Sequence, residues 1–472
     1  MVYFFIICYD EKGINMSILL NIIIGLFGLG IVVFFHELGH FLAARFVKIN
    51  VEAFSIGWGP PFLKKKIGGV EYRLGVFPVG GYCKMQGETN AWEKTPEKDK
   101  SEMKVYAEDG SYMEASPWKR IVVAAGGPFF NFILAIIIFA FIWGIGFEIY
   151  TVGNKIILAS DVIQDASFPA DAAGMQTGDR IIKINGTDIN YYHELQELIS
   201  LNAEKPLLIT VERDGRELPI NITPAIDRST GAGRIGIYSW IDPKIDTVTE
   251  GSPAFMAGLR SGDIIVSANG ISVRNTEDFK AVRNFSSEYF TDNFKIEYER
   301  YGLRHEAEIS SADIEGELGF TWEIISYRTG NLSIPRAIVT GIKESYKTLV
   351  VSITSLRLLF MGIDLTQAVS GPVRITYMIG DIATQGFEQG AGTGFRSIAN
   401  FIALISVALC VMNLLPLPIL DGGMIILFFI EMIRRKPIPT KAISVFNACG
   451  MAIILGLMLF ALFGDIMFFV RG

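Results

Sequence analysis

The chain contains few cysteines, few histidines and a modest share of charged residues. Of its 472 residues, four are cysteines, four are histidines, and 19% carry charge. The cysteines are Cys8, Cys83, Cys410 and Cys449. They show no paired zinc-type spacing and none lies in segment 151–330, so no disulfide framework is expected. The formal net charge is −7, and an acidic balance disfavours nucleic-acid binding.

The first residues also lack the features of a signal peptide. A short apolar stretch, Val2–Cys8, is followed at once by charged residues. A signal peptide would have a charged start, a longer apolar core and a cleavage site with small residues. Met16 is therefore an alternative start to Met1.

What the chain does have is long apolar runs with few or no charged residues. Half of its residues are hydrophobic, and the mean hydropathy is +0.37, as in membrane proteins. Four runs are long enough to cross a bilayer: 18–47, 121–147, 398–420 and 442–470. The sequence therefore predicts a multi-pass α-helical membrane protein with four transmembrane helices and both termini on one side.

Basic residues predict the orientation of these runs. They follow the first run, precede the second and fill the link between the third and fourth, at Lys48, Lys64–Lys66, Lys119, Arg120, Arg434–Lys436 and Lys441. Loops rich in Lys and Arg tend to face the cytoplasm. Segment 151–330 is therefore expected on the outer side of the membrane.

The first run ends in His36-Glu37-Leu38-Gly39-His40. Two imidazoles four residues apart share one helical face and can bind one ion, and the glutamate between them can act on a nearby water. An ionisable residue inside a span costs about 2.5–3.5 kcal/mol, which makes a chance cluster improbable. The alternatives are two histidines satisfied by neighbours, or a zinc motif beside a buried core helix of a soluble protein.

A catalytic zinc ion needs a third protein ligand. The other two histidines lie in the outward segment, so Asp421 at the end of the third run is the better candidate. Pro416 and Pro418 remove backbone donors there, and a helix broken at membrane depth marks a functional cavity. The alternative is an aspartate that ends a helix at the interface and pairs with Arg434.

Segment 151–330 carries about eleven more acidic than basic residues and contains an internal repeat. Ala173–Ile182 recurs 84 residues later as Ala257–Ile265, and Asn185-Gly186 recurs as Asn269-Gly270. Each copy predicts a short helix, a Gly-Asp turn, a strand and a hairpin. This pattern resembles that of bacterial PDZ domains, which are α+β domains that capture extended peptides at a sheet edge.

Two glycine-containing loops resemble the PDZ loop that receives a peptide carboxylate. They are Arg234–Ile237 and Gly316–Phe320. Alternatively each loop only turns a strand, and the tandem acts as a steric gate.

Residues 334–363 place charged side chains among Ile, Val and Leu. This pattern predicts an amphipathic helix at the outer membrane surface. A fifth span is the alternative, and it would reverse the orientation of everything after it.

Together these motifs resemble the site-2 protease family of intramembrane zinc metalloproteases, in particular the bacterial regulator of sigma-E protease. The resemblance covers the chain from Ser17 onward and includes Asn413–Gly423, which reads NLLPLPILDGG. It implies a Zn²⁺ cofactor with His36, His40 and Asp421 as ligands, and Glu37 as general base.

The resemblance extends to residues around this site. Residues 54–85 resemble the family's membrane-associated β-hairpin, 127–131 its second-span motif and 370–373 its stretch before the third span. The expected substrate-binding residues are Tyr82, Cys83, Lys84, Met85, Asn131, Asn413, Pro416 and Pro418. Met424 and the long loop 89–116 depart from the family pattern.

The resemblance implies cleavage of transmembrane segments in single-span proteins, such as anti-sigma factors and remnant signal peptides. The protein would lie in a bacterial inner membrane with its active site near the cytoplasm, while the PDZ pair outside would gate access or bind a peptide. A transporter and a membrane-anchored scaffold with a dead protease site are the rival classes.

The expected division of the chain follows from these assignments. It comprises the N-terminal half of the protease core (17–150), two PDZ domains (151–240 and 241–328), an amphipathic helix with a linker (329–395) and the C-terminal half of the core (396–472).

Overall fold

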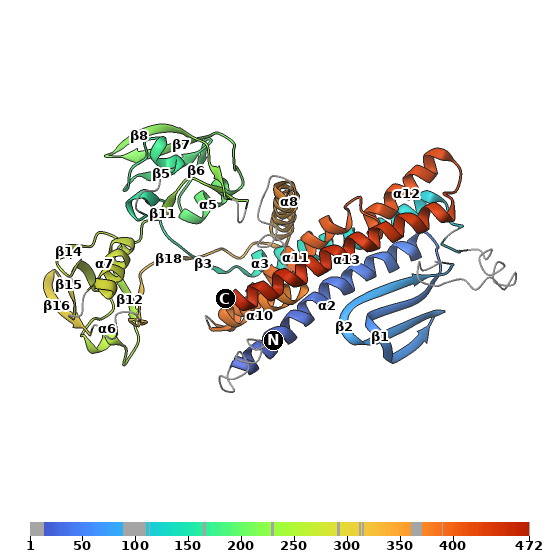
Figure 1. The fold of residues 1–472 in the computed structure, drawn as a ribbon, viewed down its shortest axis with the longest axis horizontal. Coiled ribbons are helices and arrows are strands. Elements are labelled where there is room, and N and C mark those ends of the chain that lie inside the picture. The colour runs from blue at the N-terminus through green and yellow to red at the C-terminus, as the bar shows by residue number, and fades with distance from the viewer. Residues whose placement is uncertain are drawn as a thin grey trace. The chain divides into compact units, whose positions relative to one another are not determined.

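The computed structural model describes residues 14–87, 110–112, 114–163, 167–227, 231–289, 293–310, 313, 316–359, 371–388 and 390–471. Most of loop 89–116, the stretch Val2–Cys8 and Ser370 lie outside these residues. The chain forms two compact units, shown in Figure 1. The helical unit comprises residues 1–147 and 330–472, and the repeat unit comprises 148–329.

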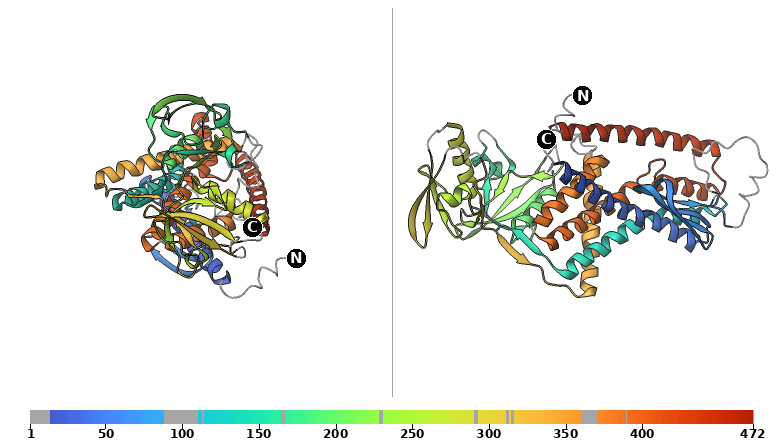
Figure 2. Two further views of the ribbon diagram at one scale, coloured as in Figure 1. Left: turned by 90° about the vertical axis from the view of Figure 1, so that its left-hand side faces the viewer. Right: turned by 90° about the horizontal axis from the view of Figure 1, so that it is seen from below.

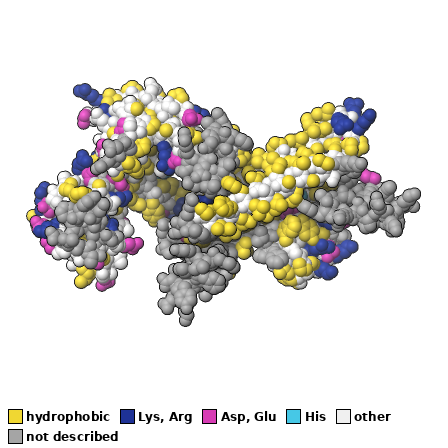
Figure 3. All heavy atoms as spheres, viewed as in Figure 1, with side chains coloured by type: hydrophobic (Ala, Val, Ile, Leu, Met, Phe, Trp, Pro, Cys, Tyr) yellow, Lys and Arg dark blue, Asp and Glu magenta, His cyan; other side chains and the backbone are white. Residues whose placement is uncertain are grey.

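Four helices of the helical unit are long and apolar enough to cross a membrane. They are α2 (Ile14–Phe46), α3 (Pro117–Ile145), α11 (Ala391–Asn413) and α13 (Thr440–Arg471). On the face in Figure 3, apolar side chains cover α13, and basic residues gather near the end of α12 (Asp421–Arg434). The predicted multi-pass membrane protein is confirmed at this level.

The third apolar run is broken between α11 and α12. Helix α11 ends at Asn413, and α12 begins at Asp421. The connection folds tightly on itself, because a Cβ on Gly422 would lie 2.3 Å from the Leu414 oxygen and one on Gly423 would lie 2.0 Å from the Leu417 oxygen. The break lies where the two prolines predict it, and the paired glycines allow the chain to turn directly into α12.

Two more helices precede α11. Helix α8 (Ile334–Leu359) carries exposed apolar residues along one side, as its amphipathic pattern predicts, and is not among the four candidate spans of the described chain. Helix α10 (Pro372–Glu388) occupies a stretch expected to be a linker. It packs on α2, where a Cβ on Gly25 would lie 2.3 Å from the Thr376 oxygen, so small residues rather than a long apolar run create this contact.

A buried carboxylate joins α13 to α10. Asp465 on α13 is 2% exposed and accepts hydrogen bonds from the backbone N–H groups of Gly371 at 2.8 Å and Val373 at 3.1 Å. These are unpaired donors of the first turn of α10, so the carboxylate caps that helix. Figure 2 shows α13 running along one side of the helical unit.

Helices α2 and α3 cross in backbone contact at two glycines. A Cβ on Gly39 would lie 2.2 Å from the Gly126 oxygen, and a Cβ on Gly126 would lie 2.6 Å from the Gly39 oxygen. Any side chain at either position would force the two helices apart. This crossing sets the distance between α3 and the histidines of α2.

Strands β1 (Val51–Ile67) and β2 (Val70–Met85) form the predicted hairpin. Each long strand contributes two segments, because Ala53 pairs with both Glu71 and Lys84. The register places 51–56 between 71–74 and 81–85, with 63–67 outside 70–74. Segments 53–56 and 71–74 run parallel, and the other neighbours are antiparallel, so residues 81–85 form one outer edge of a mixed sheet.

One face of this hairpin packs on α2. The Phe54 ring lies 5.4 Å from Phe41 and 6.1 Å from Phe34, and Phe41 lies 6.1 Å from Tyr72, as centroid distances. Met85 is 5% exposed within the same cluster. Apolar packing thus holds the 81–85 edge beside the end of the first span.

The repeat unit contains two copies of one fold. The first sheet has the order β6-β5-β7-β8 and the second has the order β14-β13-β15-β16. The first copy comprises β5 (Arg180–Ile184), β6 (Thr187–Asp188), α5 (Tyr192–Ser200), β7 (Leu207–Arg213) and β8 (Arg216–Ile222). The second comprises β13 (Ile264–Ala268), β14 (Ile271–Ser272), α7 (Thr276–Tyr289), β15 (Phe294–Arg300) and β16 (Leu303–Ile309).

Shorter elements complete the unit. They are β3 (Glu148–Thr151), β4 (Ile156–Leu158), the 3₁₀ helix η2 (Ala159–Asp161), α4 (Pro169–Ala172), β9 (Ala225–Ile226), β10 (Gly233–Arg234), β11 (Ile237–Ser239), β12 (Ile245–Val248), α6 (Pro253–Met256), β17 (Phe320–Trp322) and β18 (Ile325–Arg328). Strands β3 and β18 pair, so the chain enters and leaves the unit along one ribbon.

The repeated Gly-Asp turn has the same structural role in both copies. Asp179 accepts from Arg213 at 2.7 Å, and Asp263 accepts from Arg300 at 2.7 Å. Both aspartates are buried, at 1% and 0% exposed. Each carboxylate thus ties the turn before one strand to the end of a neighbouring strand.

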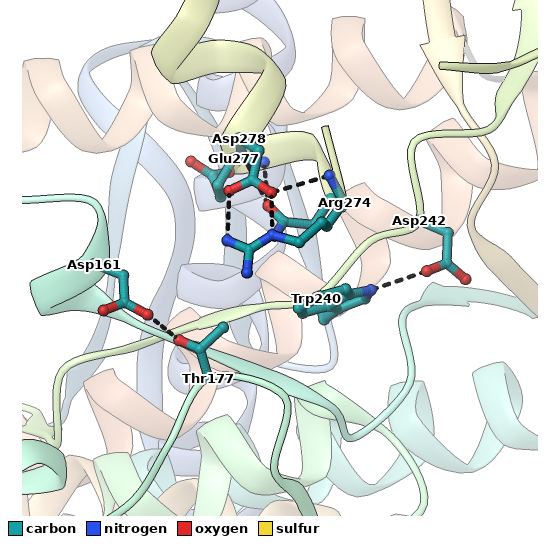
Figure 4. Close-up of polar contacts among 8 residues, drawn as sticks. Asp161, Thr177, Trp240, Asp242, Arg274, Glu277 and Asp278 are labelled. Atoms are coloured by element: carbon teal, nitrogen blue, oxygen red, sulfur yellow. Dashed lines mark hydrogen bonds and ion pairs between the residues drawn. The ribbon is translucent and has the colours of Figure 1, made fainter. Parts of the chain in front are cut away.

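Polar contacts surround the junction between the copies (Figure 4). Trp240 donates to Asp242 at 2.9 Å, and the Lys155 ammonium lies 3.5 Å from the centre of the Trp240 ring. The Arg274 guanidinium donates a hydrogen bond to Asp278, which raises the pKa of the guanidinium, and the charge of Asp161 in the first copy raises it further by a smaller amount. Charged residues of the two copies therefore interact across their junction.

The α2–α3 crossing predicts the effect of one added methyl group. Gly126→Ala should lower the free energy of unfolding by about 1–3 kcal/mol, because the new Cβ overlaps the Gly39 oxygen. Gly144→Ala on the same helix is the control, since its Cβ would make an ordinary 3.6 Å contact with Ala337. Thermal unfolding in detergent measures both, and equal stability of the two variants would contradict the tight crossing.

Candidate metal centre

Three side chains from two helices meet at one point. His36 and His40 lie on successive turns of α2, and Asp421 is the first residue of α12. The His36 Nε2 atom lies 3.3 Å from Asp421 Oδ2, the His40 Nε2 atom lies 3.5 Å from Asp421 Oδ1, and the two Nε2 atoms are 3.2 Å apart. These atoms form a group that could hold a metal ion.

Helix α3 supports both imidazoles. The His40 Nδ1 atom lies 2.8 Å from the Val123 carbonyl oxygen. Because a carbonyl only accepts, Nδ1 carries the proton and Nε2 keeps its lone pair toward Asp421. Gly127, one turn further along α3, lets the helix lie against the rings, since a Cβ there would be 2.4 Å from His40 Nε2 and 2.6 Å from His36 Cε1.

The donor set fits zinc. Two imidazole nitrogens and one carboxylate oxygen are a common ligand set of catalytic zinc sites, which leave a fourth position for water or substrate. With bonds of about 2.0–2.1 Å, a tetrahedral site has edges of about 3.3–3.4 Å between ligand atoms. The three measured separations, 3.2, 3.3 and 3.5 Å, are close to this value.

Glu37 lies between the histidines and contacts the hairpin. The backbone N–H of Cys83 donates a hydrogen bond to its carboxylate. A Cβ on Gly81 would lie 3.2 Å from the Glu37 Cγ atom, so the carboxylate rests against the 81–85 edge. The glutamate is therefore held beside both the candidate metal centre and a sheet edge that faces it.

Comparison with known proteins agrees with this arrangement. The model of Peptidase family M50 matches residues 24–457. The chain belongs to this family, the site-2 proteases. Among its relatives are proteins provisionally named zinc metalloproteases from Treponema pallidum, 34% identical over 95% of this chain and 99% of the relative, and from Neisseria meningitidis, 31% identical over 93% and 97%. A relative from Borreliella burgdorferi is 29% identical over 93% and 96%.

The chain is therefore an M50 zinc metalloprotease and an integral membrane protein, and its cofactor is zinc. The membrane spans of the family agree with the four apolar helices described above. The broken α11–α12 connection brings Asp421 to the histidines, and no ion pair between Asp421 and Arg434 occurs among the described residues. The interfacial alternative for Asp421 is thus disfavoured.

The residues expected to bind substrate occupy two regions of this M50 protease. Tyr82, Cys83 and Lys84 line a cavity of about 660 Å³ on the hairpin, where Tyr82 accepts from Arg73 at 2.8 Å and Lys84 pairs with Glu52 at 3.5 Å. Met85 is buried in the hairpin core.

The other expected residues lie nearer the metal centre. Asn413 at the end of α11 places its Nδ2 atom 3.4 Å from His36 Nε2. Pro416 and Pro418 lie in the α11–α12 connection, and Pro418 packs against Gly450 of α13. Asn131 is fully buried, with its amide 3.3 Å from His36 Nδ1.

Sequence reasoning did not find the support that α3 and the hairpin give the site. The Val123 carbonyl and the Cys83 N–H are backbone groups, so no side-chain pattern reveals them. The glycine pair before Pro128 was a visible signal, because adjacent glycines in a helix permit close approach of another element. The sequence did not show that the element approaching these glycines is the histidine-bearing turn of α2.

The close approach of α3 predicts a loss of metal when it is disturbed. Gly127→Ala places a methyl group where the His40 and His36 rings lie, so the imidazoles must move apart and zinc content should fall well below that of the wild type. Metal analysis of purified, dialysed protein measures this. Gly144→Ala should retain zinc, and full zinc content in Gly127→Ala would mean that the rings do not depend on this contact.

Proposed function

We propose that this M50 protease is an intramembrane endopeptidase that cleaves transmembrane segments of single-span membrane proteins. The observation that carries the proposal is the position of the His36, His40 and Asp421 group between apolar helices and beside a sheet edge. We assign these three residues as the zinc ligands. When bound, zinc supplies Lewis acidity that polarises a substrate carbonyl and acidifies water.

Glu37 is the proposed general base. Its carboxylate lies on the histidine-bearing turn of α2 and is oriented by the Cys83 N–H. It takes a proton from the attacking water and then gives a proton to the leaving amine. Asn413, 3.4 Å from His36 Nε2, is close enough to donate to the substrate carbonyl during this step.

The hairpin edge explains how a helical substrate is presented. A peptide bond inside a helix is shielded by its own hydrogen bonds, so the segment must unwind before attack. An unwound segment needs new backbone partners in a membrane, and addition to the edge formed by Tyr82–Met85 supplies them. Pro416 and Pro418 keep the α11–α12 connection free of helix, and we assign both to contact with the bound substrate strand.

The charge distribution supports an orientation in a bacterial inner membrane. Arg434, Arg435 and Lys436 are exposed at the end of α12, and Lys64–Lys66 are exposed on the hairpin. Basic ends of this kind favour the cytoplasmic side. The proposed active site then lies near the cytoplasm, and the acidic repeat unit lies outside.

We further propose that the two repeats are PDZ domains that gate access to the active site. In the first copy, the Gly236 carbonyl and the Trp240 N–H form hydrogen bonds on the side of β11 that faces β4. Backbone groups alternate in direction along a strand, so the Ile237 carbonyl points to the opposite edge of β11. Tyr192 donates to that carbonyl at 3.1 Å, and burial raises the pKa of its hydroxyl to about 12, which keeps the proton in place.

This tyrosine distinguishes the copies. Its hydroxyl occupies the Ile237 carbonyl, a hydrogen-bond acceptor that an added peptide strand would need. The first copy is therefore suited to act as a steric filter. The equivalent position in the second copy, 84 residues later, is the buried Thr276, whose side chain is too short for this role. Peptide capture is therefore assigned to the second copy.

The role of Glu37 predicts separation of metal binding from catalysis. Glu37→Gln should keep zinc and lower cleavage of a single-span reporter by about 10²–10⁴-fold, because the amide cannot accept the proton. Gel analysis of reporter cleavage with the purified protein measures this. Glu344→Gln on α8 is a matched control and should cleave like the wild type. Unchanged cleavage by Glu37→Gln would remove the assigned base.

The gating proposal predicts a dependence on substrate size. A reporter whose outer part has been trimmed to a short tail should be cleaved faster than the same span carrying a folded outer domain. The two reporters share one transmembrane segment, so the difference isolates the outer part. Cleavage of both at equal rates by the full-length protein would contradict a steric gate while leaving the protease assignment intact.

A further inference from the structure

Asn131 of α3 is an unusual residue because it is fully buried yet only partly bonded. Its side chain is 0% exposed, and its Nδ2 atom lies 3.3 Å from His36 Nδ1. Its Oδ1 atom has no hydrogen-bond partner in the part of the chain that the structure describes. A buried amide oxygen without a partner loses its hydrogen bonds to water on folding and gains none in return, which is destabilising.

The two orientations of this carboxamide fill the same space but fix opposite tautomers of His36. If the NH₂ group faces Nδ1, then Nδ1 must be the acceptor and the proton sits on Nε2, which points at Asp421. If the carbonyl faces Nδ1, it accepts the Nδ1 proton, and Nε2 keeps its lone pair. Only the second orientation, in which the Asn131 carbonyl accepts the Nδ1 proton, leaves a lone pair on Nε2 that can bind zinc.

We propose that Asn131 is a positioning residue that holds His36 in the tautomer able to bind zinc. Its carbonyl accepts the Nδ1 proton, just as the Val123 carbonyl does for His40. The inference rests on the proposed ligand set. It replaces the substrate contact that the sequence suggested for Asn131, because a wholly buried group behind His36 is on the side of the ring away from Asp421.

The register of α2 and α3 supports this role. Val123, Gly127 and Asn131 follow one another at four-residue intervals, so they lie along one face of α3. Val123 contacts His40, Gly127 lies against both rings, and Asn131 contacts His36. One face of α3 thus sets the orientation of both imidazoles. The contacts follow α3 and α2 in opposite chain directions, as expected for antiparallel helices.

The position of Asn131 is itself fixed from a third helix. Ser406 on α11 donates from its hydroxyl to the Asn131 backbone oxygen at 2.8 Å, and Ser406 is 0% exposed. Helix α11 ends at Asn413, whose amide approaches the other nitrogen of His36. His36 therefore lies between two amides, with Asn131 behind the ring and Asn413 on the zinc side.

The test is zinc affinity measured by competition with a chelator on the purified full-length protein. Asn131→Leu removes the acceptor at similar volume and should weaken zinc binding by about 10–100-fold, as loss of an outer-shell partner does. Asn131→Asp keeps an acceptor at the same place and should bind zinc about as well as the wild type. Asn131→Ala replaces the leucine variant if that variant does not fold.

Two results would overturn the proposal: wild-type affinity in Asn131→Leu or Asn131→Ala, or an equal loss in Asn131→Asp, which would indicate packing alone. Gly144→Ala on the same helix, whose Cβ would make an ordinary 3.6 Å contact with Ala337, is the control and should retain wild-type zinc affinity. His36→Ala, measured in parallel, tests the ligand set itself. Wild-type affinity in that variant would refute the proposed zinc site, which is a different outcome from failure of the Asn131 role alone.

Discussion

The site depends on the backbone contact between α2 and α3. Gly39 and Gly126 let the two helices approach so closely that no side chain fits between them. At that separation, the face of α3 that carries Val123 and Gly127 lies directly on the two imidazoles. Without it, the HExxH turn would present two flexible rings to the membrane interior, where unpaired polar groups are costly.

The second requirement is that a distant part of the chain returns to this turn. Asp421 follows an irregular connection that ends α11 and starts α12, and paired glycines let that connection close on itself. The repeat unit is inserted between the two halves of the helical unit, so the site is assembled from segments on either side of it. With the proposed ligands His36, His40 and Asp421, a bound zinc ion would link the folding of both halves to zinc binding.

The sequence predicted the parts of this protein that are governed by local periodicity. The four apolar runs, the HExxH face and the helix break at Pro416 all follow from side-chain spacing, and each is present in the structure. The repeat predicted two similar folding units, and the two four-stranded sheets have the equivalent orders β6-β5-β7-β8 and β14-β13-β15-β16. Membership in the site-2 protease family is confirmed by the comparisons.

What the sequence did not reveal is set by tertiary contacts. Helix α10 packs through small residues and a partly buried hydrogen bond that Thr384 donates to Asn21. Such contacts leave no apolar run in the sequence by which they could be predicted. The Cys83 N–H and the Val123 carbonyl act through the backbone, which every sequence shares. Asn131 was recognised as important, but its spacing could not show which side of His36 it would face.

X-ray absorption at the zinc edge tests the central claim most directly, because it reports the atoms bonded to the metal in the purified protein. We expect a first shell of nitrogen and oxygen at about 2.0–2.1 Å, with the scattering pattern of two imidazoles that disappears when His36 and His40 are both replaced by alanine. A first shell containing sulfur at about 2.3 Å, or an unchanged spectrum in the double variant, would place zinc elsewhere and contradict the account.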